Sequence, residues 1–105
     1  MDKQQIAKEA LAKTWAWATE KDAGRSNAWS FISGRAKACR IDLDNMDAAP
    51  EDMDWVAFCG DLVTGLNADD RETRECAREW SDSGWYDESS GRAASMLWRE
   101  LRSGE

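Results

Sequence analysis

Apolar residues recur along this chain at intervals of three and four, which is the spacing of one face of an α-helix. No stretch alternates apolar and polar residues for long enough to predict a β-strand. Turn and capping residues divide the pattern into five segments, so we expect an all-α fold, a compact bundle of about five helices in a single domain over residues 1–105. The apolar stripes begin and end near Ile6–Ala18, Trp29–Cys39, Trp55–Leu66, Thr73–Trp80 and Ala94–Leu101.

Capping residues set the expected helix ends. Gly24 can end the first helix, and Ser26 or Asn27 can cap the second. Pro50 suits the first turn of the third helix, and Gly65 can close it, because proline needs no N–H partner there and glycine adopts the conformation that ends helices. Asn67 with Asp70 resembles a capping pair for a fourth helix, and Ser89 or Ser90 can cap the fifth. Gly34 suggests close packing or a kink inside the second helix.

Tryptophan is unusually abundant, with seven residues in 105. Five of them fall on the apolar stripes and are expected to face the core, namely Trp17, Trp29, Trp55, Trp80 and Trp98. Trp15 lies beside its stripe, and Trp85-Tyr86 falls in a turn among carboxylates. An aromatic ring surrounded by carboxylates suits a basic partner, so these three are the better candidates for an interface.

Charge is divided unevenly along the chain. Residues 1–40 carry eight Lys and Arg against four Asp and Glu, whereas the remainder is strongly acidic and the whole chain has a net charge of −7. Between Arg40 and Arg71 there are nine carboxylates and no cation, namely Asp42, Asp44, Asp47, Glu51, Asp52, Asp54, Asp61, Asp69 and Asp70. Such a run costs self-repulsion, so a cationic partner is one explanation for it. A solvated face is another, and favourable placement of acids at a helix start is a third.

Catalysis has little support in the sequence. Histidine is absent, and exposed carboxylates keep ordinary acidities, so we expect no enzyme, no cofactor and no metal centre. The run Asp42-x-Asp44-Asn45-x-Asp47 begins like a calcium loop, but Asp47 stands where glycine is needed and Met53 where a bidentate glutamate is needed. The three cysteines, Cys39, Cys59 and Cys76, are too far apart for a thiolate metal site and are expected to be small buried side chains.

A small, acidic, helical chain with a dense carboxylate run resembles, in general character, phage-encoded anti-defence inhibitors such as anti-CRISPR and anti-restriction proteins. The residues that carry the resemblance are the run Asp42 to Asp54 and its continuation to Asp70. It implies a DNA mimic in which carboxylates occupy the Lys/Arg-lined channel of a nucleic-acid-binding complex. The partner-binding residues would be Asp42, Asp44, Asp47, Glu51, Asp52 and Asp54, with Trp85 and Tyr86 as anchors.

Two other functions remain open. The chain can be an interaction module, such as an antitoxin or adaptor, whose acids only solubilise it. A regulator that binds DNA through the basic residues of the first forty positions is less favoured, because a net charge of −7 repels a phosphate backbone. The lack of a signal peptide or membrane-spanning run predicts a cytoplasmic protein, in the host cell if it is phage-encoded, with no membrane partner and no direct contact to nucleic acid.

Overall fold

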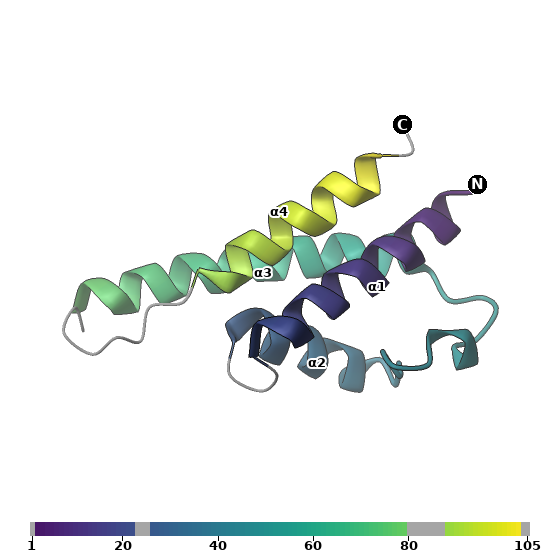
Figure 1. The fold of residues 1–105 in the computed structure, drawn as a ribbon, viewed down its shortest axis with the longest axis horizontal. Helices are drawn as coiled ribbons and strands as arrows, with labels where there is room; N and C mark the ends of the chain where they lie inside the picture. Colours follow the sequence, from purple (N-terminus) through teal and green to yellow (C-terminus); the bar gives the residue numbers. More distant parts are fainter. Residues whose placement is uncertain (1, 23–25, 80–87, 104–105) are drawn as a thin grey trace.

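The computed structural model describes residues 2–22, 26–79 and 88–103. These parts contain four α-helices, α1 (Lys3–Asp22), α2 (Asn27–Ala38), α3 (Trp55–Glu79) and α4 (Ser89–Arg102), a short 3₁₀ helix at Met46–Ala48 and no strand. The all-α expectation is confirmed, with four helices in place of five. Figure 1 shows α4 running back along α3, with α1 crossing beside them and α2 packed below.

The predicted third and fourth helices are one continuous helix, so the expected break at Gly65 and the capping pair Asn67 and Asp70 are wrong. Gly65 lies in the middle of α3 beneath the ring of Phe31 from α2, and a Cβ at this position would overlap that ring. The glycine is therefore needed for the close approach of two helices. Its local tendency to end a helix is overridden by that packing.

The core forms between all four helices, which contact one another in every pair, and α4 makes the most extensive contacts with α1 and α3. The fully buried side chains come from all four helices, and the larger ones are Leu11, Ile32, Leu62, Leu66 and Leu97. These residues lie on the stripes that the sequence predicts. Burying each such aliphatic side chain contributes about 1.5–3 kcal/mol to folding.

Helix α2 is fixed at both ends. Ser26 is its N-cap, with the Trp29 N–H donating to Oγ at 3.0 Å, and Ser89 of α4 accepts a second bond from the Ala28 N–H. At the other end, the Ile41 N–H donates to the Ala36 carbonyl across a left-handed Arg40, with φ of 58°. This arrangement is a Schellman ending, and it turns the chain out of α2.

The start of α4 differs from expectation. Glu88, not Ser89 or Ser90, occupies the N-cap position and makes no side-chain cap bond. Both serines bond to other helices: Ser89 caps α2, and the Ser90 hydroxyl donates to Asp69 Oδ2 on α3 at 2.5 Å. Two residues that the sequence assigns to local capping therefore hold three helices together.

Helix α3 begins five residues later than Pro50 suggests. Its first residue is Trp55, and Asp54 accepts the Ala57 N–H at 3.0 Å as a cap. The Gln4 side-chain oxygen from α1 accepts the Trp55 N–H at 2.6 Å. Glu51 and Asp52 thus lie outside the first turn, so the helix dipole does not explain their charge.

Two further expectations about packing are wrong, and the close packing suggested at Gly34 is absent. Trp98 is 52 % exposed although it shares the expected inward stripe of α4 with Leu97. Cys39 is exposed because α2 ends at Ala38 and the chain turns away from the core there. Gly34 meets no atom that a Cβ would touch, so it marks no close contact. Trp80 lies outside the described residues.

The two described cysteines should react very differently with thiol reagents. Cys59 is buried beside the Ala7 carbonyl, and burial raises its pKa to about 12, whereas Cys39 is exposed. Only thiolates react rapidly. In a Cys76→Ser background we expect one fast equivalent with Ellman's reagent at pH 8 and a second only after unfolding. Equal rates for both thiols would contradict the burial of Cys59.

Across the described ranges, no helix combines the length and the apolarity that are needed to cross a membrane.

Candidate functional site

The acidic segment, residues 41–54, connects α2 to α3 and has two distinct sides. Its apolar residues face the protein: Ile41 is buried, and Leu43, Met46, Ala49 and Met53 pack against the core. Its carboxylates are all exposed, namely Asp42, Asp44, Asp47, Glu51, Asp52 and Asp54. The structure therefore places the six predicted acids on the exposed surface of one ordered segment.

Helix α1 holds this segment at three points. Gln4 donates to Asp54 Oδ1 at 3.0 Å, Lys8 pairs with Asp47 at 2.6 Å, and the Trp15 indole N–H donates to Asp44 at 3.2 Å. Positions 4, 8 and 15 lie on one side of a helix. As the numbers rise along α1, their partners in the segment fall from 54 to 47 to 44. The acidic segment thus runs antiparallel to α1, in the loop that Figure 1 draws between α2 and α3.

Trp15 is fixed by two contacts. Its ring stacks on Trp29 of α2, with centroids 5.8 Å apart and planes at 26°, and its N–H is bonded to Asp44. The half-buried ring therefore joins α1, α2 and the acidic segment. Trp85 and Tyr86, the two other aromatic candidates, lie outside the described residues.

The predicted acids differ in how they are bound within the fold. Asp54 caps α3, Asp47 has a cationic partner, and Asp42 accepts the backbone N–H of Asp44 at 3.0 Å. Glu51 and Asp52 make no hydrogen bond or ion pair with any other described residue. These two carboxylates, with Asp42, present charge that no cation of the described chain offsets.

Acid should weaken the attachment of this segment. The pKa of Asp47 is lowered by its hydrogen bond and charge pairing with Lys8, and that of Asp54 is lowered by hydrogen bonds from Gln4 and Ala57, both from an ordinary value of 3.8. Groups with lowered pKa values stabilise the fold above their unfolded pKa and lose that effect as the pH falls through the folded one.

We therefore expect Asp47→Asn to have a lower melting temperature than the parent protein at pH 7. The two melting temperatures should converge as the pH falls below 3.8. Melting curves by circular dichroism from pH 7 to pH 2.5 test this. Lys8→Gln should reproduce the result, whereas Asp61→Asn, which removes an exposed acid with no partner among the described residues, should not. A difference between Asp47→Asn and the parent that persists unchanged at pH 2.5 would contradict the electrostatic origin.

Three of the described basic residues in the first forty positions contact other groups of the fold. Lys8 is bound to Asp47, Lys13 pairs with Glu100 at 3.1 Å, and the Arg35 guanidinium lies 5.2 Å from the centre of the Phe31 ring. Two of the cations are thus offset by carboxylates from elsewhere in the chain. These two ion pairs reduce the positive charge that the DNA-binding alternative could use.

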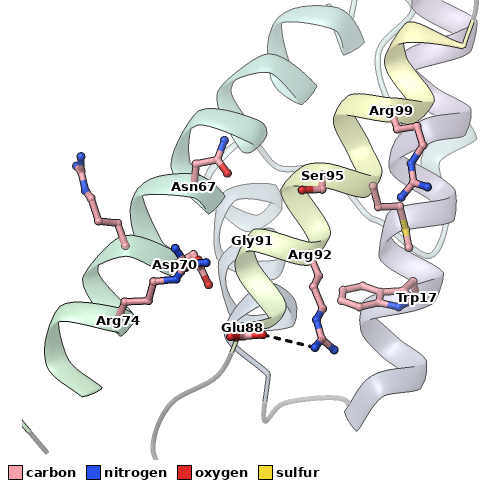
Figure 2. Close-up of a pocket in the computed structure, with 11 residues that line it drawn as sticks. Trp17, Asn67, Asp70, Arg74, Glu88, Gly91, Arg92, Ser95 and Arg99 are labelled. Carbon is pink, nitrogen blue, oxygen red and sulfur yellow. Dashed lines mark hydrogen bonds and ion pairs between the residues drawn. The ribbon is translucent and has the colours of Figure 1, made fainter. Parts of the chain in front are cut away.

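Arginines gather elsewhere, in a cleft that the sequence does not predict. The cleft is an open hollow of about 700 Å³ over α4, bordered by α3 and α1. Figure 2 shows Asp70 and Arg74 on the α3 side, Gly91 and Ser95 in the middle, and Arg92 and Arg99 toward Trp17 of α1. Arg71 also lines it. The sequence signal was weak, because Arg71 and Arg74 appear as part of a solvated helix face.

Among the described residues, no group of three or more histidine, cysteine or carboxylate side chains is placed to hold a metal ion. No protein-family model, curated protein or solved structure matches this chain.

Proposed function

We propose that the protein is a non-catalytic inhibitor that binds a nucleic-acid-binding bacterial defence effector through the acidic segment. A CRISPR surveillance complex is the leading target, and the effect of binding would be to block its target DNA. The observation that carries the proposal is the arrangement of the acidic segment: apolar residues anchor it, and its six carboxylates are all exposed. Only Lys8 pairs with any of them within the described chain.

Electrostatics supports this reading. A channel lined with Lys and Arg attracts DNA through its phosphates, and it attracts other anionic surfaces of suitable spacing in the same way. A segment fixed to α1 at three points loses little conformational freedom on binding, which favours affinity. Association should be rapid at low salt and weaken as salt screens the charges.

An ordinary interaction module is the second candidate, and one observation favours it. Trp98 is half exposed on α4, with the Arg102 guanidinium 5.5 Å from its ring centre, and Val56 is 39 % exposed on α3. Exposed tryptophan is enriched at binding hot spots. A partner bound through such contacts would be nearly insensitive to moderate salt.

A salt-graded capture experiment separates the two functions. The protein is immobilised and exposed to lysates that contain CRISPR and restriction effectors, and bound proteins are eluted from 0.05 to 0.5 M NaCl. A nucleic-acid-binding effector that is released by salt and displaced by its own target DNA supports the inhibitor. A partner that resists both treatments, and is lost instead with Trp98→Ala, would establish the interaction module.

A further inference from the structure

The arginine-lined cleft is separate from the acidic segment and has features that the proposed function does not use. Gly91 and Ser95 of α4 lie in its middle, and the small Gly91 leaves room for the Asp70 carboxylate that packs against it. Its volume of about 700 Å³ falls in the range of small-molecule sites. The residues around it combine three kinds of chemistry.

Cationic groups are the first kind. Four arginines line the cleft, Arg71 and Arg74 from α3 and Arg92 and Arg99 from α4. Arg74 pairs with Asp70 at 3.2 Å, and Arg92 pairs with Glu88 at 3.5 Å, the contact dashed in Figure 2. Arg71 and Arg99 are exposed and make no ion pair with any other described residue. In a protein of net charge −7, this is a local excess of positive charge suited to phosphate or carboxylate groups.

A buried hydrogen-bond acceptor is the second kind. Asp70 is only 5 % exposed, and its Oδ1 has no hydrogen-bond partner among the described residues. Such a group costs about 1–3 kcal/mol unless something donates to it. The carboxylate lies directly against Gly91, where a Cβ would come within 2.9 Å of Oδ2. A ligand that carries both an N–H or O–H donor and negative charge would satisfy this acceptor as well as the arginines.

An aromatic surface is the third kind. Trp17 of α1 is half-buried and borders the cleft beside Arg92. A tryptophan ring stacks well on the planar rings of bases, whatever the base. Phosphate, a hydroxyl or amino donor, and a planar ring occur together in one common class of metabolite.

We propose that this cleft binds a mononucleotide. The phosphates lie against the arginines, a sugar hydroxyl or base amino group donates to Asp70 Oδ1, and the base contacts Trp17. A mononucleotide fits the volume of the cleft, and the net charge of −7 disfavours the longer polyanion of a nucleic-acid strand. The site shares no residue with the acidic segment, so the inhibitor proposal and this one can fail independently.

Isothermal titration calorimetry with the full chain tests the proposal. The probes are AMP, ATP, adenosine, inorganic phosphate and a ten-residue oligothymidylate, at 0.05 M NaCl. We expect saturable 1:1 binding of AMP or ATP, at least tenfold tighter than that of phosphate or adenosine alone. No saturable binding at millimolar nucleotide, or equal affinity for phosphate, would overturn the proposal, as would an oligonucleotide bound a hundredfold more tightly than ATP.

Variants assign the binding to the cleft. Arg71→Gln with Arg99→Gln removes two exposed charges without breaking a described ion pair and should weaken nucleotide binding at least tenfold. The matched control, Lys3→Gln with Lys37→Gln, removes the same charge from α1 and α2, outside the cleft, and should change affinity less than twofold. Asp70→Asn should reduce the preference for AMP over phosphate. Equal losses in the two double variants would overturn the assignment.

Discussion

Leu97→Ala is expected to destabilise the protein by about 2–5 kcal/mol, whereas Trp98→Ala, one residue away, should cost about 1 kcal/mol or less. Leu97 is fully buried on α4, and its loss leaves a cavity in the helix that contacts the other three. Trp98 is half exposed, and its described ring contact is with Arg102 on the same helix.

Urea unfolding followed by circular dichroism measures both effects. The pair is a strict test of the rotation of α4, because adjacent residues point about 100° apart on a helix. If Trp98→Ala proved the more damaging of the two, the orientation of α4 would be wrong. If Leu97→Ala fails to fold, Leu97→Val at the same position supplies a smaller, measurable loss.

Neutralising the three acids of the segment that bond to neither a cation nor a helix is expected to weaken binding to the captured effector about 100-fold at 0.1 M NaCl. The variant combines Asp42→Asn, Glu51→Gln and Asp52→Asn. The expected loss of about 100-fold assumes that each lost charge contact contributes about 1 kcal/mol to binding. Asp47 and Asp54 are left intact because they fasten the segment to α1 and cap α3, so changing all six acids would also disturb the fold.

The control for this variant is Glu20→Gln, Glu72→Gln and Glu75→Gln, which removes the same charge from exposed positions on α1 and α3. It should lose less than threefold in affinity, and both variants should keep the helical signal and melting temperature of the parent. Surface plasmon resonance at several salt concentrations gives the affinities. If the two variants lost affinity equally, net charge alone would explain the loss, and a specific role for the acidic segment would be excluded.

The buried stripes of the helices were predictable from sequence because periodicity reports which residues share a face. Leu11, Ile32, Leu62 and Leu97 all lie where their spacing places them. Gly65 was misinterpreted for a physical reason: its role depends on Phe31, which is distant in sequence and meets it only after folding. Local propensity cannot report a contact of that kind.

The candidate sites were predictable to different degrees. In the acidic segment, Ile41, Leu43 and Met46 are interleaved with Asp42, Asp44 and Asp47 without a regular period, so the sequence predicted only a loop rich in carboxylates. Its attachment to Gln4, Lys8 and Trp15 depends on tertiary structure. The arginine-lined cleft could be found only from the tertiary structure, because its residues come from α1, α3 and α4.

The position of α4 has a consequence for synthesis of the protein. Helices α1, α2 and α3 leave the ribosome before α4, yet both α1 and α3 make their most extensive contacts with it. The nascent chain therefore exposes apolar surface until α4 arrives, and such surface invites aggregation or chaperone binding. Substitutions that delay the docking of α4 should consequently reduce the yield of protein from cells before they alter the activity of the molecules that fold.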